Sequence, residues 1–416
     1  MKIVQTLCAM LAATATVAVV AAAADADAVG ATSPPTASGS QYNNIYTQDE
    51  LKFCGWRIRT PALVRTRKAV HAIGRCCGEN LCTGKSHKCI GHGKNEHCWP
   101  PKQPGDDASL WSHIYDDAEP RLADDNSFST TVMKTSWDGG KTWGNFQVLS
   151  PKGETGHSCA HGVYDAAGET LIVQWSHFGT NTTRPATHVR QWQMASTDDG
   201  QSWTWPEDIS AQIAGCSASA DNQMYLSAGS KIQTHTGRML WPAHSFGGYA
   251  CVWYSDDGGK TYNTSNILAK ANEISVAEVA VKNGRHQILM DGRGSDKAWK
   301  PHRTRYWSTD DGAHWGKGQA SALLDDAGSG CERALINVEG TLFTSEPQGP
   351  GRTKMVLQCS TDNGKTFPKS HVVNGDLSGG YSALLGASDL VKGGLLMLWE
   401  NDDGNQYAGV IATDWC

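Results

Sequence analysis

The sequence predicts an all-β fold, a β-propeller built from four-stranded blades. The main observation is a short pattern, Ser-x-Asp-x-Gly-x-x-aromatic, that occurs five times along the 416 residues. The serines of successive copies are 60, 59, 53 and 52 residues apart, a spacing typical of a repeat architecture. The copies are Ser136–Trp143, Ser196–Trp203, Ser255–Tyr262, Ser308–Trp315 and Ser360–Phe367.

Each copy has the composition of a tight hairpin turn. Ser and Asp side chains hydrogen-bond nearby backbone groups, Gly supplies a positive φ, and the aromatic residue can fold back over the hairpin. Apolar, β-rich runs such as Ser129–Met133, Ala250–Tyr254 and Lys354–Cys359 flank the copies. A strand, a turn and a strand in each repeat indicate propeller blades. The alternative is a string of unrelated surface turns, and the regular spacing argues against it.

The chain is expected to form one large domain over residues 49–416, because a propeller is a single domain despite its length. Residues 1–24 begin with Lys2 and continue as an Ala/Val-rich run, which predicts a signal peptide and a secreted protein. A membrane anchor is disfavoured, since the run is weakly apolar and no basic cluster follows it. Residues 25–48, rich in Ala, Ser, Thr, Pro and Asp, are predicted to be a flexible leader. No span of the bilayer is expected in the mature chain.

Thirteen cysteines are present, and twelve remain once Cys8 leaves with the signal peptide. An even number in a secreted chain favours disulfides over free thiols. Five of them crowd into one segment: Cys76, Cys77, Cys82, Cys89 and Cys98. Three nearby histidines raise the alternative of a zinc site, but the spacings fit no common zinc pattern. We therefore expect a disulfide-knotted loop, with no metal and no cofactor.

Charge and sequons limit the partners. The net charge of −6 argues against nucleic acid, and any anionic ligand must be captured by a local cluster of arginines. Asn181 and Asn263 begin acceptor sequons for N-glycosylation, which is consistent with secretion.

The five copies match the Asp box and resemble the bacterial neuraminidase (BNR) repeat of sialidases. The box also occurs in propellers that are not sialidases, so it indicates fold rather than activity. Beyond the boxes, residues 53–416 resemble the exo-α-sialidases, a resemblance that implies a six-bladed β-propeller with five recognisable Asp-box turns. It is carried by Arg59–Val64, Ser227–Gln233, Gly237–Pro242, Asn272–Glu278, Asp291–Arg293, Gly351–Arg352, Gly380–Leu384 and Leu398–Glu400.

The resemblance implies a triad of substrate-binding arginines, Arg59, Arg293 and Arg352, which come from three different repeats. Sialic acid carries a carboxylate on its anomeric carbon, and the planar guanidinium fork suits paired hydrogen bonds to a carboxylate. Arg57 is a rival for the first position, but only Arg59 has the family's offset to Pro61. Glu400 is expected to pair with Arg59 and hold its guanidinium in place.

The resemblance also implies a tyrosine nucleophile, Tyr381, because a carboxylate nucleophile would be repelled by the carboxylate of the substrate. A phenol with a pKa near ~10 needs a base in contact with it at neutral pH. Glu273 takes that role by its position in the motif. Glu278 is the alternative, for which a structural role is favoured.

Asp125 is expected to be the general acid/base, since it lies eleven residues before the first box, as in the family. The adjacent Asp124 is the rival. The interval of 66 residues from Arg59 to Asp125 is longer than the family's, and the excess coincides with the Cys-rich stretch. We therefore interpret residues 76–118 as an insertion over the rim near the active site.

Together these features predict a secreted, retaining exo-α-sialidase. It would remove terminal sialic acids from glycoproteins, glycolipids or oligosaccharides. Three alternatives remain open: a propeller that binds sialic acid without cleaving it, a trans-sialidase, and a hydrolase of deaminated nonulosonic acids. Pocket shape decides among the enzymatic ones, and the sequence does not specify it.

Overall fold

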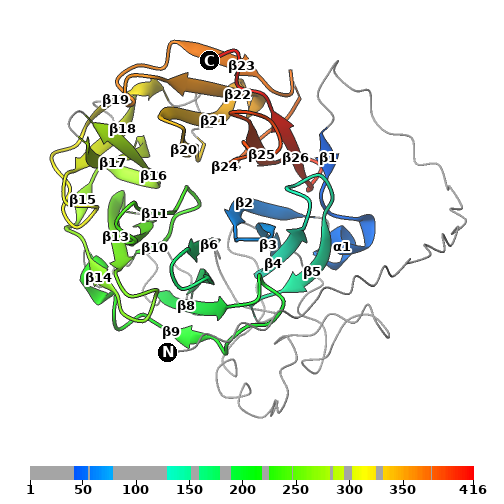
Figure 1. Cartoon of the computed structure of the whole chain (residues 1–416), viewed down its shortest axis with the longest axis horizontal. Helices are drawn as coiled ribbons and strands as arrows, with labels where there is room; N and C mark the ends of the chain where they lie inside the picture. Colours follow the sequence, from blue (N-terminus) through cyan, green and yellow to red (C-terminus); the bar gives the residue numbers. More distant parts are fainter. Residues whose placement is uncertain are drawn as a thin grey trace, which may run out of the picture. The chain divides into compact units, whose positions relative to one another are not determined.

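The chain forms a six-bladed β-propeller, which confirms the predicted all-β fold and the number of blades (Figure 1). The computed structural model describes residues 42–54, 57–77, 129–150, 159–178, 189–217, 224–245, 247–281, 284–294, 302–324, 331–375 and 377–416. The predicted signal peptide, Asp125, the Asn181 sequon and nearly all of the Cys-rich segment lie outside these residues. Within them, no helix is long and apolar enough to cross a membrane.

Each blade is an antiparallel sheet whose strands succeed one another outward from the propeller axis. Blade 1 contains β2 (Ile58–Arg65), β3 (Val70–Cys77), β4 (Ser129–Ser136) and β5 (Gly144–Val148). Blade 2 contains β6 (Ala160–Asp165), β7 (Thr170–Phe178), β8 (Val189–Ser196) and β9 (Glu207–Asp208). Blade 3 contains β10 (Tyr225–Leu226), β11 (Ile232–Gln233), β12 (Met239–His244), β13 (Tyr249–Ser255), β14 (Asn263–Thr264) and β15 (Leu268–Ala269).

The second half of the chain repeats the same plan. Blade 4 contains β16 (Ala271–Val281), β17 (Arg285–Gly294), β18 (His302–Ser308) and β19 (Gln319–Leu324). Blade 5 contains β20 (Ala334–Val338), β21 (Thr341–Gly349), β22 (Thr353–Ser360) and β23 (Lys369–Val372). Blade 6 contains β24 (Ser382–Gly386), β25 (Leu395–Glu400), β26 (Gln406–Ile411) and, from the other end of the chain, β1 (Asn43–Asn44). A short helix, α1 (Gln48–Phe53), and a 3₁₀ turn, η4 (Ala214–Cys216), complete the described elements.

The ring is closed by the N-terminal segment. β1 pairs with β26, Asn43 opposite Ala408, and so supplies the outermost strand of blade 6. Ile45 and Tyr46 follow it and are 2% and 3% exposed. The predicted leader of residues 25–48 therefore extends too far, because its last residues belong to the propeller. Ile45 and Tyr46 pack against blade 1 and so give a defined structure to residues whose composition predicted flexibility.

The Asp boxes connect the third and fourth strands of blades 1 to 5. In the first box, Ser136 Oγ donates to Asp138 Oδ1 and accepts from Gly140 N at 2.7 Å each. The same carboxylate oxygen accepts the backbone N–H groups of Lys141 and Thr142 at 3.1 and 2.9 Å. The box thus satisfies the polar groups of a reversing chain from within the turn. Blade 6 has no box, because its third and fourth strands come from opposite ends of the chain.

We expect the boxes to make folding stability depend on pH in the acid range. Partial burial opposes ionisation of Asp138 and Asp362, but the hydrogen bonds each receives outweigh it and lower both pKa values to about 2, from an ordinary 3.8. Their stabilising contribution is therefore complete above pH 3.8 and lost as the pH falls through 2. Urea unfolding between pH 5 and pH 2 measures this loss. Asp362→Asn should lower stability at pH 5 and approach the wild type near pH 2, whereas Asp414→Asn, at an exposed position outside the boxes, should behave as the wild type throughout.

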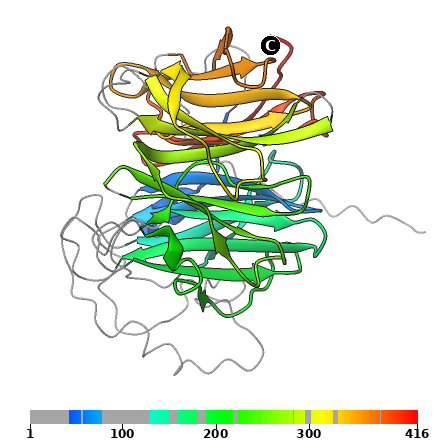
Figure 2. The same cartoon turned by 90° about the vertical axis from the view of Figure 1, so that its left-hand side faces the viewer.

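The hydrophobic core consists of layers between neighbouring blades rather than one central mass. Between blades 2 and 3, for example, Val163 and Ile172 pack against Trp241 and Trp253, all nearly inaccessible to solvent. Comparable layers of buried side chains separate the other pairs, including blades 6 and 1. Figure 2 shows the sheets of neighbouring blades stacked face to face. Because buried side chains of the two neighbouring blades pack against each inner strand, side chains that project from it toward the axis have a rigid backbone.

The expectation that cysteines are paired is only partly met. Disulfides join Cys54 to Cys76, Cys216 to Cys251 and Cys359 to Cys416. Cys76 therefore lies within strand β3, which ends at Cys77, and its disulfide partner Cys54 lies outside the Cys-rich segment, so an insertion begins after Cys77 and not at residue 76. Cys159 and Cys331, in contrast, are free and buried among the described residues. The number of cysteines could not identify these two free thiols, because an even total fits a chain in which every cysteine is paired and also a chain in which two stay free.

Candidate active site

Tyr381 lies at the propeller axis, immediately before inner strand β24, and only 9% of its surface is exposed. Its carbonyl accepts the N–H of Glu400, at the end of β25, at 3.0 Å. The preceding Gly380 is required by close packing, since a Cβ there would lie 2.6 Å from the Glu400 Oε1 atom. The Gly-Tyr-Ser motif therefore places the phenol in a narrow position that a side chain at residue 380 would disturb.

The Tyr381 hydroxyl donates to the carboxylate of Glu273, which lies on β16 in blade 4. Glu273 sits at an irregularity in the pairing of β16 with β17, between Asn272 and Ile274, and its φ of 41° is in the left-handed region. Such a conformation is unfavourable for a glutamate and is often found where a functional side chain is redirected. The second carboxylate oxygen of Glu273 accepts Arg293 Nη1 at 2.8 Å.

Electrostatics keep the proton on the tyrosine at rest. Burial raises the pKa of Tyr381 well above its ordinary value, and the negative charge of Glu273 adds to the effect. Burial also opposes ionisation of Glu273, but the Arg293 guanidinium and the Tyr381 hydrogen bond hold its pKa below the ordinary value. At neutral pH the pair is therefore a neutral phenol donating to a carboxylate, an arrangement suited to base-assisted attack.

The three predicted arginines converge on this pair from blades 1, 4 and 5. Arg59 extends from β2 and Arg352 from the turn between β21 and β22. Their Cζ atoms lie 5.7 and 5.5 Å from the centre of the Tyr381 ring. Arg293 forms an ion pair with Glu273, the carboxylate that accepts the Tyr381 hydroxyl. The rival Arg57 is exposed. The result is a cluster of positive charge over a tyrosine, which is the chemistry needed to hold a carboxylate and to stabilise a phenolate.

Glu400 positions the first of these arginines. Its Oε1 accepts Arg59 Nη2 at 3.3 Å, and its Oε2 accepts the backbone N–H of Thr60 at 3.0 Å. Thr60 has a φ of 51° and stands at an irregularity between β2 and β3. One carboxylate thus fixes both the guanidinium and the unusual backbone beside it.

Among the described residues, one predicted alternative, Glu278, is not in this cluster. Asp125 and its rival Asp124 lie outside the described residues, so their positions stay predictions. Glu278, the alternative to Glu273, contacts the imidazoles of His235 and His286 instead of Tyr381. Five residues along an extended strand correspond to about 16 Å, which removes Glu278 from the phenol.

Several residues around the cluster carried no assignment from the sequence. Cys159, Ala228 and Cys331 surround Tyr381, and burial lowers the pKa of His244, near Glu273, to about 4. Burial likewise lowers the pKa of Lys231 to about 7. Lys231 lies inside the Ser227–Gln233 motif, so the motif indicated the segment but not which side chain points inward.

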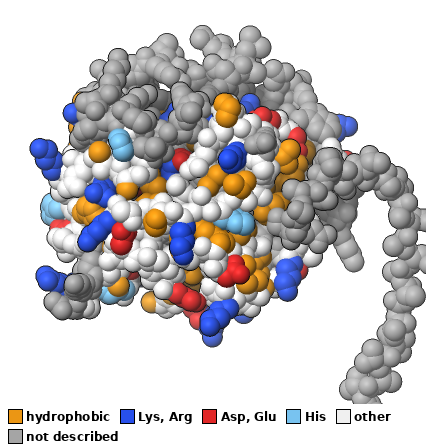
Figure 3. Space-filling model, turned by 90° about the horizontal axis from the view of Figure 1, so that it is seen from above, with side chains coloured by type: hydrophobic (Ala, Val, Ile, Leu, Met, Phe, Trp, Pro, Cys, Tyr) orange, Lys and Arg blue, Asp and Glu red, His pale blue; other side chains and the backbone are white. Residues whose placement is uncertain are grey.

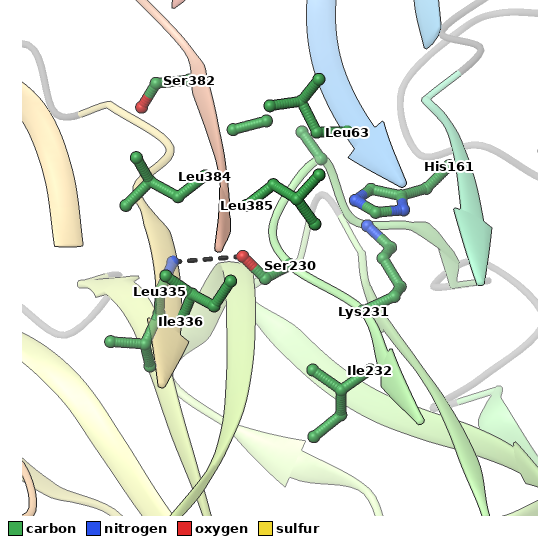
Figure 4. Close-up of a pocket in the computed structure, with 12 residues that line it drawn as sticks. Leu63, His161, Ser230, Lys231, Ile232, Leu335, Ile336, Ser382, Leu384 and Leu385 are labelled. Carbon is green, nitrogen blue, oxygen red and sulfur yellow. Dashed lines mark hydrogen bonds between the residues drawn. The ribbon is translucent and has the colours of Figure 1, made fainter. Parts of the chain in front are cut away.

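A cavity of about 80 Å³ lies among the inner strands (Figure 4). Its walls are mostly Leu, Ile and Ala, with Lys231 and His161 at one side; none of the three arginines lines it. Leu335 N donates to Ser230 Oγ across this region at 3.1 Å. An apolar wall without the arginines does not suit an anionic sugar, so the candidate site is the arginine cluster and not this cavity.

Among the described residues visible in Figure 3, the outer surface shows no competing basic patch. Lysine and arginine side chains are interspersed there with aspartate and glutamate. On that face, an anionic ligand finds alternating charges rather than a uniform positive field.

Comparisons with known proteins identify the family and fold that this chain resembles. The profile of the BNR repeat-like domain matches residues 123–396. The curated sialidase of Micromonospora viridifaciens is 27% identical over 327 residues, which cover 70% of this chain and 48% of that protein. The chain spans about half the length of this relative.

Two solved structures show the same fold. The Hadza microbial sialidase Hz136 superimposes with a TM-score of 0.62 at 18% identity, and the match covers 85% of this chain and 65% of that one. Trypanosoma rangeli sialidase in complex with 2,3-difluorosialic acid, described as a covalent intermediate, gives a TM-score of 0.59 at 17% identity. That match covers 85% of this chain and 54% of the other.

Proposed function

This chain belongs to the BNR repeat-like domain family, and from that premise we propose that it is a retaining exo-α-sialidase. The observation that carries the proposal is the Tyr381–Glu273 pair enclosed by Arg59, Arg293 and Arg352. The sialidase names of the relatives support it. The substrates we propose are terminal sialic acids on glycoproteins, glycolipids or oligosaccharides, released outside the cell.

Binding begins with the carboxylate on the anomeric carbon of the substrate. The guanidinium groups of the triad hydrogen-bond it and neutralise its charge. An uncharged phenol approaches this carbon without the repulsion that a carboxylate nucleophile would meet. The triad therefore does two things: it holds the sugar and makes a tyrosine nucleophile effective.

In the first step the Tyr381 oxygen forms a bond to the anomeric carbon, and its proton moves to Glu273. The glycosidic bond breaks, and Asp125 gives its proton to the departing oxygen. The high pKa of Tyr381 and the low pKa of Glu273 make a free phenolate costly at rest. Proton transfer to Glu273 during bond formation avoids a free phenolate, because the Tyr381 oxygen bonds to the anomeric carbon as it loses its proton.

In the second step water, deprotonated by Asp125, attacks the anomeric carbon. The bond to Tyr381 breaks, and the phenol recovers its proton from Glu273. Two inversions return the original α configuration. A sugar hydroxyl in place of water would give transfer instead of hydrolysis.

The direct test is turnover of an aryl α-sialoside followed by NMR of the product. We expect the α anomer of free sialic acid to appear first. Incubation with 2,3-difluorosialic acid should displace the fluoride on the anomeric carbon and add the mass of the reagent less HF to the peptide containing Tyr381. Binding of sialic acid without turnover would instead establish a sialic-acid-binding propeller, and a first-formed β anomer would exclude the retaining mechanism.

The assignment of Asp125 predicts a dependence on the leaving group. Asp125→Ala should reduce kcat on a sialyl-galactoside by about 10²–10⁴-fold, since an alkoxide leaves poorly without a proton. Release of a nitrophenol, which needs no proton, should fall far less. Paired assays on the two substrates measure the difference. Asp124→Ala is the matched control, and the same selective loss in that variant rather than in Asp125→Ala would assign the acid to Asp124.

A further inference from the structure

A second cluster of chemically active side chains lies between blades 3 and 4. It comprises His235 in the turn between β11 and β12, Glu278 on β16 and His286 on β17. One ligand atom from each residue lies within 4.8 Å of the other two. Glu278 is opposite Ile288 and His286 is opposite Ala280, so the glutamate and this histidine are diagonal neighbours on one face of the blade 4 sheet. The blade 3 turn brings His235 over them.

The two imidazole rings stack nearly parallel, with centroids 3.9 Å apart and planes inclined by 16°. Both Nδ1 atoms point at the same carboxylate oxygen, Glu278 Oε1: His235 Nδ1 hydrogen-bonds it, and His286 Nδ1 lies 3.2 Å away. The backbone N–H of His235 fixes the other oxygen, Oε2, at 2.9 Å. The carboxylate is thereby held in place by the turn that also carries one of the imidazoles.

The Nδ1 atom of His286 is buried and has no hydrogen-bond partner within the described part of the chain. A buried nitrogen without a partner is unfavourable, and its contact with Glu278 lacks hydrogen-bond geometry. The cluster therefore holds an imidazole nitrogen without a hydrogen-bond partner beside a carboxylate and a second imidazole. These are the groups and the convergence that a first-row divalent metal requires.

We propose that His235, Glu278 and His286 form a binding site for a zinc-like divalent cation that links blades 3 and 4. Zinc accepts imidazole nitrogen and carboxylate oxygen at about 2.0–2.2 Å, which places ligand atoms roughly 3.3 Å apart in a tetrahedron. His286 Nδ1 already lies 3.2 Å from Glu278 Oε1, whereas the shorter hydrogen bond between His235 Nδ1 and this oxygen has to lengthen, a small side-chain rotation that the exposed turn carrying His235 can supply. Three protein ligands leave one position for water. Imidazole ligands favour zinc over calcium or magnesium, which prefer an all-oxygen shell.

The ion would act on stability rather than on the sugar chemistry. Glu278 lies on the same strand as Glu273 but about 16 Å further along, and its carboxylate does not contact Tyr381. A cation that binds only the folded propeller raises its stability by an amount that grows with the logarithm of the cation concentration once that concentration exceeds Kd. Because the ligands come from two blades, the ion would oppose their separation at an interface that no described disulfide crosses.

The test compares zinc uptake by the full chain with that of His235→Ala, His286→Ala and the control His314→Ala. His314 is a suitable control because it is an exposed imidazole that also pairs with an aspartate, Asp310. After dialysis against zinc, elemental analysis should find one ion fewer per chain in the first two variants and no change in the control. The difference isolates this site from any other zinc bound by the chain.

A second readout locates the ion. With histidines labelled at Cε1, zinc should shift two imidazole signals in the wild type; each variant should lack one of these signals, and zinc should no longer shift the other. Zinc should also raise the melting temperature of the wild type more than that of His235→Ala, which stays informative if His286→Ala fails to fold. Equal zinc uptake by wild type and His235→Ala, or an equal rise in melting temperature, would overturn the proposal.

Discussion

A Tyr381→Phe variant is expected to lose at least about 10³-fold in kcat on an aryl α-sialoside. Phenylalanine keeps the ring that lies between Arg59 and Arg352 but removes the oxygen that would attack the sugar. The arginines remain, so affinity for free sialic acid should change only a few-fold. Steady-state kinetics together with calorimetric binding of sialic acid separates the two effects: kcat falls while Kd is nearly unchanged.

Tyr407→Phe is the matched control for this variant. Tyr407 also donates its hydroxyl to a carboxylate, that of Asp403, and its ring stacks on Trp399 in the same blade. Its removal deletes a comparable hydrogen bond away from the arginine cluster and should leave kcat unchanged. A Tyr381→Phe enzyme that turns over within tenfold of the wild type would contradict the nucleophile assignment. Loss of sialic acid binding in that variant would point to a structural role of the hydroxyl.

The features of the fold that could be predicted are those encoded by neighbouring residues. An Asp box closes a turn through contacts among residues no more than four positions apart, as Ser136, Asp138 and Gly140 show. The closure of blade 6 could not be predicted in this way. Strand β1 is only two residues long, carries no motif, and pairs with residues at the far end of the chain. Its place depends on the rest of the propeller being folded.

In the candidate site, too, some features could be predicted from local motifs, and others depend on the folded propeller. Arg59, Arg293, Arg352 and Tyr381 each stand in a recognisable motif, and the propeller geometry brings them together. The motif favoured Glu273 over Glu278 but gave no physical reason: both belong to one strand, and the irregularity beside Asn272 directs Glu273 at the tyrosine. The free thiols of Cys159 and Cys331 beside Tyr381 were missed, since their identity as thiols depends on which cysteines lie nearby in space.

A Glu273→Gln variant is expected to lose about 10²–10⁴-fold in kcat. The amide has nearly the same volume as the carboxylate, but it does not take the proton of Tyr381, whose pKa burial has already raised. The loss should be smaller than for Tyr381→Phe, because water can accept a proton in place of a missing base, whereas nothing replaces a missing nucleophile. Glu169→Gln is the control: it removes a glutamate that pairs with an arginine, Arg67, at an exposed position.

The pH profile distinguishes a base from a residue that only positions Arg293. A base must be ionised, and the pKa of Glu273 is held below its ordinary value of 4.5, so the wild-type enzyme should keep its kcat/KM as the pH falls to 4.5 and lose it below. In Glu273→Gln that acidic limb should disappear, because an amide does not titrate. An unchanged acidic limb in the variant would assign the limb to another group and reduce Glu273 to a partner of Arg293. The acid limb is therefore the more decisive measurement, since a fall in kcat alone would follow from either role.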